Sequence, residues 1–320
     1  MGLLIPEVFI LLLTDVLFVM LLIYALPSAV SIAFRWDMTN VSEAQYNREK
    51  RRYLISTIIF FVFALKIPLF LFYIYTNDKM ANVLTGAMCA AGSINATIYG
   101  SKLFILKVLN IYLMTAWLTM YKSNNSFLDL PFTRLNYRFL LLVISLIIFE
   151  TVIEFLNFSG IDPTAVVSCC SSIYSSSTEA KEVIARIDPF TGFYIFIFIS
   201  VLYLISTLIK KPFMMLITSA LFLFFGWENL ISFTSTYVYE LPSHKCPFCI
   251  LQKEYGYIGY LFYISLFIST ASSLSFYIYS KLTSRANIRL RNIAIAFALI
   301  FIFLSLFFPL KYFFINKIWL

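Results

Sequence analysis

The feature that most constrains this chain is a series of apolar runs long enough to cross a lipid bilayer. A helix needs about 20 mainly apolar residues to span the hydrocarbon core. Only 12% of the 320 residues are charged, whereas a soluble domain usually has about 25%. We therefore predict an all-α, polytopic membrane bundle in the lipid bilayer, with residues 1–320 forming a single integral membrane domain. The eight expected spans are residues 7–34, 53–76, 101–121, 137–158, 190–209, 213–236, 256–280 and 293–315.

The basic residues between the spans predict the orientation of the chain. Its formal net charge is +8. Short loops rich in Lys and Arg remain on the cytoplasmic side of a membrane, so this charge does not require a nucleic-acid partner. The expected cytoplasmic loops place both termini outside. They are residues 35–52, 122–138, 210–211 and 281–292.

All five cysteines fall in the expected outer loops. Cys89 lies in residues 77–100, Cys169 and Cys170 in 159–189, and Cys246 and Cys249 in 237–255. Thiol chemistry is typical of oxidising compartments outside the cytoplasm. Residues 80–100 are rich in small side chains, which allow close packing. They fit a short or re-entrant helix that holds a cysteine over the bundle, or an ordinary loop.

The motif Cys246-Pro247-Phe248-Cys249 is the strongest chemical signal in the chain. A C-x-x-C pair suits a reactive disulfide, two ligands of one metal ion, or a structural bridge. We expect the motif directly before the seventh span. There, the unpaired N–H groups of the helix would lower the pKa of the first thiol. His244 and Lys245 add positive potential.

The segment CPFCILQK resembles the C-P-L-C-I-x-Q-R segment of the DsbB family over about ten residues. Those proteins are four-helix bundles of the bacterial cytoplasmic (inner) membrane that make disulfides and pass the electrons to quinone. The resemblance implies that Cys246 and Cys249 form the redox pair, that Lys253 takes the place of the arginine beside the quinone, and that a periplasmic thiol protein is the partner. The chain departs from the family in its eight expected spans and in its Lys for Arg.

Three hypotheses remain open for the cysteines. In the redox hypothesis, Cys89 or the adjacent Cys169 and Cys170 would relay oxidising equivalents to the C-x-x-C pair. In the metal hypothesis, one His and three Cys would bind zinc or copper supplied by a metal chaperone. The ligands in that case would be His244, Cys246, Cys249 and Cys89. As a third alternative, the chain is a membrane subunit of a larger complex with structural disulfides.

Six charged residues fall inside the apolar spans. Charge at such depth is costly, so these side chains should face the bundle interior or a water-filled cavity. We expect a proton path or a cation entry route, and structural ion pairs are the alternative. Glu228 precedes the cysteine loop and is also a candidate for the cofactor site. The six residues are Asp15, Lys66, Lys107, Glu150, Glu154 and Glu228.

Overall fold

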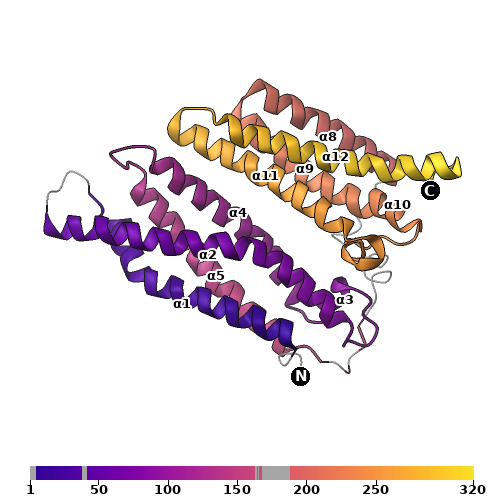
Figure 1. Ribbon diagram of the computed structural model, residues 1–320, viewed down its shortest axis with the longest axis horizontal. Helices are drawn as coiled ribbons and strands as arrows, with labels where there is room; N and C mark the ends of the chain where they lie inside the picture. Colours follow the sequence, from indigo (N-terminus) through magenta and orange to yellow (C-terminus); the bar gives the residue numbers. More distant parts are fainter. Residues whose placement is uncertain (1–4, 38–41, 163, 165, 168–187) are drawn as a thin grey trace. The chain divides into compact units, whose positions relative to one another are not determined.

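The computed structural model describes residues 5–37, 42–162, 164, 166–167 and 188–320, and this part of the chain contains helices and no strand (Figure 1). Among the described residues, eight helices are long and apolar enough to cross a membrane. The predicted all-α architecture is confirmed, and the chain is an integral membrane protein. The orientation of the termini stays a prediction. Although we expected a single domain, the chain divides into two compact units.

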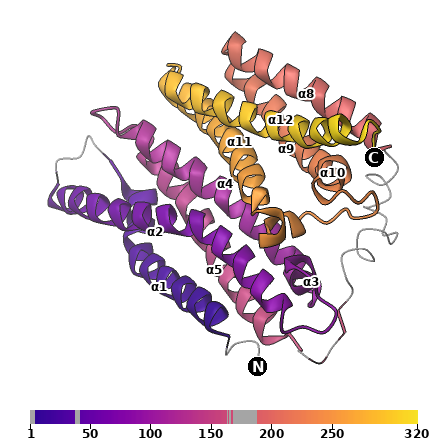
Figure 2. The same cartoon turned by 45° about the vertical axis from the view of Figure 1, so that its right-hand side comes forward.

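The first unit comprises Met1–Thr85 and Ser93–Val167. Its four long helices form a closed bundle: α1 packs on α2 and α5, and α4 packs on the same two helices (Figure 2). Each helix therefore has two neighbours, which leaves a shared interior between the four. The bounds are α1 Pro6–Arg35, α2 Glu43–Ala81, α4 Gly100–Asn124 and α5 Thr133–Ser159.

The second unit comprises Gly86–Gly92 and Ser168–Leu320. It is also built on four long helices, since α9 packs on α8 and α11, and α12 packs on the same two. One of these helices is interrupted, because a π-helical turn, η2, joins α9 to α10. The bounds are α8 Pro189–Ile209, α9 Pro212–Asn229, η2 Leu230–Thr234, α10 Ser235–Tyr239, α11 Ile258–Thr283 and α12 Ile288–Asn316.

Helix α2 extends beyond the predicted span at both ends. Residues 35–52 were expected to form a loop, but α2 already begins at Glu43, where the Ser42 side chain accepts a hydrogen bond from the Gln45 amide. An N-cap of this kind and good helix formers support a helix without apolar periodicity. The predicted boundary was wrong because hydropathy detects the part of a helix that lies in lipid, whereas the hydrogen-bonded helix continues into water.

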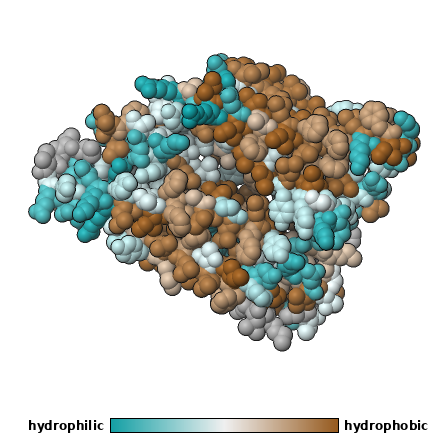
Figure 3. Space-filling view, viewed as in Figure 1, coloured by the Kyte–Doolittle hydropathy of each residue, from teal (hydrophilic) through white to brown (hydrophobic). Residues whose placement is uncertain are grey.

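Both bundles turn apolar side chains outward and keep polar groups inside. Phe9, Phe61 and Phe198 are more than half exposed, whereas Asn110 and Ser269 are fully buried. Figure 3 shows hydrophobic side chains over much of the visible surface, with hydrophilic residues gathered in separate patches. This pattern fits helices surrounded by lipid, in which polar groups find partners only within the bundle.

Candidate functional site

Three buried sulfur atoms meet in the second unit. The Sγ atoms of Cys89, Cys246 and Cys249 lie within 4.8 Å of one another. The Sγ atoms of Cys89 and Cys246 are 3.5 Å apart, farther than the bond of about 2.05 Å in a disulfide. The three residues are only 0%, 1% and 5% exposed. We call this group the three-cysteine cluster.

Tight turns and two tyrosines position the C-x-x-C segment. Cys249 begins a short 3₁₀ helix, η3 (Cys249–Leu251), which is followed by η4 (Lys253–Tyr255). The Tyr239 hydroxyl donates to the Cys246 carbonyl, and the Tyr263 hydroxyl donates to the Pro247 carbonyl. Helix α11 begins at Ile258, two residues after the predicted start of the seventh span, and η3 and η4 lie between the C-x-x-C motif and this helix. The predicted effect of the helix start on the first thiol stays a prediction.

Cys89 lies in the short segment 86–92, which contacts the turn that carries Cys246 and Cys249. The Gln252 side-chain amide donates to the Met88 carbonyl over 2.9 Å, and this bond ties residues 86–92 to the turn after Cys249. The Gly92 amide donates to the Cys89 carbonyl at the start of the short helix α3 (Ala90–Asn95). This hydrogen-bonded turn fixes the backbone on both sides of the cysteine, so the buried thiol is held toward the other two.

Gly259 allows α11 to approach the cysteine turn closely. A Cβ atom added there would lie 2.7 Å from Ile250 Cγ1 and 2.9 Å from the Ile250 carbonyl oxygen. We expect Gly259→Ala to displace Ile250 and, with it, Cys249. The expected result is a free energy of unfolding lower by about 1–3 kcal/mol, as is typical of overpacking, measured by SDS titration of the protein in detergent. Ala271→Ser, a change of similar size farther along α11, should change it by less than about 0.5 kcal/mol. Equal stabilities for both variants would contradict a close-packing role for Gly259.

Backbone and side-chain groups shield the three-cysteine cluster from water. The Phe248 amide donates to Cys246 Sγ over 3.4 Å. Burial and the neighbouring Cys249 and Glu254 raise the pKa of Tyr255 above its usual value. The Tyr255 phenol therefore stays neutral near the cluster at physiological pH.

Other predicted site residues lie outside the three-cysteine cluster. His244 is absent from the group of atoms within 4.8 Å, and its ring packs edge-on against Tyr239 with centroids 4.4 Å apart. Lys253 is exposed at the start of η4. Cys169 and Cys170 lie outside the described residues. The structure therefore brings together three of the four predicted metal ligands.

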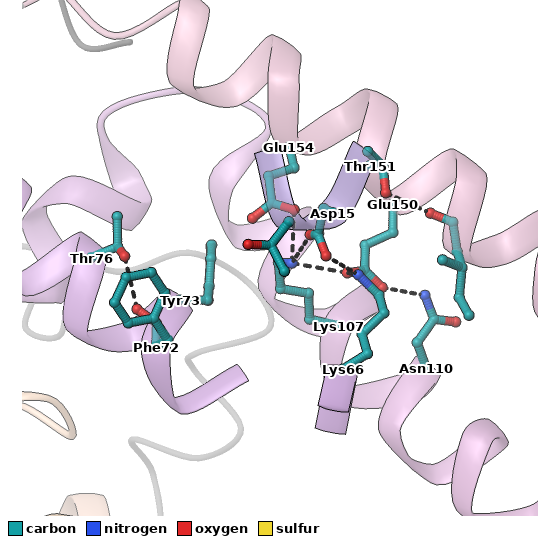
Figure 4. A network of polar contacts seen from close by, with 12 residues as sticks. Asp15, Lys66, Phe72, Tyr73, Thr76, Lys107, Asn110, Glu150, Thr151 and Glu154 are labelled. Atoms are coloured by element: carbon teal, nitrogen blue, oxygen red, sulfur yellow. Dashed lines mark hydrogen bonds and ion pairs between the residues drawn. The ribbon is translucent and has the colours of Figure 1, made fainter. Parts of the chain in front are cut away.

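The charged residues of the first unit form a second buried group. Lys66 Nζ is 2.7 Å from Asp15 Oδ1 and 3.1 Å from Glu150 Oε1. Lys107 Nζ is 2.9 Å from both Glu150 Oε1 and Glu154 Oε2. All five residues are at most 6% exposed. Figure 4 shows their side chains pointing toward one another from four helices. We call this group the five-charge cluster.

Sequence reasoning missed two polar partners of the five-charge cluster. Asn110 Nδ2 donates to Glu150 Oε2 over 2.5 Å, and Lys107 Nζ lies 4.8 Å from the centre of the Tyr73 ring. Asn110 follows Lys107 by three residues and is therefore on the same face of α4. That spacing is the signal that could have identified it.

Glu228 does not join either cluster. In the second unit its Oε1 accepts a hydrogen bond of 2.6 Å from Ser232 at the π-helical turn. Gly192 on α8 leaves room for this carboxylate, since a Cβ there would lie 3.0 Å from Oε2. The carboxylate is thus held by local contacts, and the predicted link to a cofactor stays a prediction.

The fold and the two clusters define a class: a polytopic helical membrane protein with buried thiols in one bundle and buried ion pairs in the other. No protein-family model, curated protein or solved structure matches the chain.

Proposed function

We propose that the protein binds one soft transition-metal cation, Cu(I) or Zn(II), through Cys89, Cys246 and Cys249. The observation that carries this proposal is the convergence of three buried sulfur atoms within 4.8 Å. Cys89 and Cys246 are 157 residues apart in the sequence. A contact between such distant buried cysteines supports a role in ligand binding or redox chemistry.

The sulfur spacing suits a metal ion. Zinc–sulfur bonds are about 2.3 Å long, so two thiolates on one tetrahedral ion lie about 3.8 Å apart. The Cys89–Cys246 separation of 3.5 Å is close to this value, and both distances to the Cys249 sulfur are at most 4.8 Å. Three thiolates without a nearby imidazole favour a soft ion, and Cu(I) accepts three sulfur ligands readily. Small shifts of these side chains would place all three sulfurs on one ion.

The burial of the cluster favours a small ligand over a protein partner. Thiol–disulfide exchange requires an attacking thiolate to reach a sulfur atom, and each of the three cysteines is at most 5% exposed. A metal cation is much smaller than a protein partner, so it needs far less room to reach the sulfur atoms. If the predicted orientation holds, the protein would take up or store its metal at the outer face of the membrane.

Thiol–disulfide oxidoreduction is the second candidate, favoured by the 3.5 Å contact between Cys89 and Cys246. Loss of two electrons and two protons from these thiols would form one S–S bond and reduce one quinone to the quinol. The resemblance of CPFCILQK to the DsbB family supports this chemistry. The second unit by itself also has four long helices, as that family does.

One combined measurement tests both candidates. The protein would be purified anaerobically in detergent without chelators, its metals would be counted by mass spectrometry, and its thiols would be mapped by alkylation. We expect about one Cu or Zn per chain, with Cys89, Cys246 and Cys249 protected together. His244→Gln is the matched control and should retain the metal, because His244 lies outside the cluster.

The other outcomes are distinct. Metal-free protein that forms a Cys89–Cys246 disulfide when quinone is added would replace metal binding by the redox function. A disulfide that resists reductant and ignores quinone would leave only a structural role, as expected for a subunit of a larger complex. Loss of metal in His244→Gln would show that the histidine belongs to the site.

A further inference from the structure

We propose that the five-charge cluster is a proton-binding site that holds one proton between Asp15 and Glu154. This inference is independent of the metal site, since it rests on the first unit alone. Three features of the first unit support it: the charge balance of the cluster, two carboxylate oxygens without a hydrogen-bond donor, and an adjoining cavity.

The charge balance requires one further positive charge. Asp15, Glu150 and Glu154 supply three negative charges, and Lys66 and Lys107 supply two positive charges. These ion pairs lie in the bundle interior, where an uncompensated charge is costly. One added proton makes the cluster neutral.

Two oxygen atoms mark the place of that proton. Asp15 Oδ2 and Glu154 Oε1 are buried and accept no hydrogen bond from any described residue. One carboxylate oxygen of Asp15 and one of Glu154 lie within 4.8 Å of each other. Two ionised carboxylates cannot hydrogen-bond to each other, because neither has a donor. A single proton would satisfy both groups.

The remaining carboxylate is already satisfied. Glu150 Oε1 pairs with Lys66 and Lys107, and its Oε2 accepts the bond from Asn110. The groups that face the shared proton are thus Asp15 from α1, Lys66 and Tyr73 from α2, Lys107 from α4, and Glu150 and Glu154 from α5. Since two ammonium groups already occupy the centre, a metal cation is a poorer fit than a proton.

A small cavity adjoins the five-charge cluster. Its volume is about 10 Å³, and Lys66, Lys107 and Glu150 line it together with Phe70 and Met114. This volume is close to the least that holds one water molecule. The cavity therefore lies beside both ammonium groups, on the Glu150 side of the cluster.

Infrared spectroscopy of the full-length protein in detergent tests the proposal. We expect a C=O stretching band of a protonated carboxyl group at neutral pH, which shifts in D₂O and disappears in Glu154→Gln. The control is Glu254→Gln, an exposed glutamate of the second unit, which should leave the band unchanged. Lys107→Met should roughly double the band area, because neutrality then requires two protons.

Three results would overturn the proposal. Wild-type protein without a protonated-carboxyl band at neutral pH would show that no proton is bound, and this spectrum needs no variant to fold. A band that survives in Glu154→Gln with unchanged area would place the proton elsewhere. A cluster stabilised by Na⁺ and lacking the band would identify a metal cation as the ligand.

Discussion

Lys107→Met is expected to lower the free energy of unfolding by about 3–5 kcal/mol, as is typical when one partner of a buried ion pair is lost. Lys107 Nζ contacts all three carboxylates of the cluster, at 2.9 Å from Glu150 and Glu154 and 3.5 Å from Asp15. Without it, three carboxyl groups share only Lys66. The bundle must then bury net negative charge or take up a second proton.

The pH dependence of this loss of stability follows from the number of protons that the folded and unfolded chains bind. A free glutamate carboxyl has a pKa of about 4.3, so protonating one at pH 7 costs about 3.7 kcal/mol. If the folded Lys107→Met protein holds one more proton than the folded wild type, its stability falls more steeply than that of the wild type as the pH rises. We therefore expect the gap from wild type to narrow between pH 7 and pH 5.

The free energy of unfolding would be measured at both pH values by adding SDS to the protein in mild detergent and recording its circular dichroism. Lys102→Met is the matched control, since Lys102 lies on the same helix but is exposed. It should change the free energy of unfolding by less than about 0.5 kcal/mol. Similar small effects for both variants would mean that the buried ion pairs contribute little to stability.

Cys246→Ser is expected to weaken Cu(I) binding by about 100-fold or more, equivalent to about 2.7 kcal/mol of binding free energy. Cys246 Sγ lies 3.5 Å from Cys89 Sγ and accepts the Phe248 amide. A serine hydroxyl has nearly the same size but is a poor ligand for a soft ion. A loss of Cu(I) affinity in Cys246→Ser therefore reflects the missing sulfur atom and not a change in packing.

Competition with a coloured Cu(I) chelator measures this affinity in detergent. Met88→Leu is the control, because it removes a soft sulfur next to Cys89 from a side chain that is 69% exposed. Its affinity should equal that of the wild type. If Cys246→Ser bound Cu(I) within about threefold of wild type, the three-cysteine cluster would not be the metal site.

The sequence predicted both groups of candidate residues but not their arrangement. Glu150 and Glu154 are four residues apart, so their common helix face could be predicted from sequence. Their partners Lys66 and Lys107 were named as candidates from depth alone. Asn110 was missed because an amide in an apolar span carries no obligatory charge to be balanced.

For the three-cysteine cluster, too, the sequence predicted residues but not their arrangement. Three of its residues were predicted together with His244, which the fold keeps outside the cluster. The start of the seventh span was predicted at residue 256 and α11 begins at Ile258, but the two 3₁₀ turns between Cys249 and this helix were not predicted. Such turns depend on local hydrogen bonds and on tyrosines from other segments, and these leave no periodic signal in the sequence.

The sequence by itself determined the membrane-spanning helical architecture, because the cost of burying polar groups in lipid is read directly from the order of apolar residues. It also determined that charges within the spans need partners. Only the tertiary structure decided which partners they find, how eight helices divide into two bundles, and that Cys89 meets Cys246. Those contacts join residues far apart in the chain, and they depend on helix packing that the local order of residues does not encode.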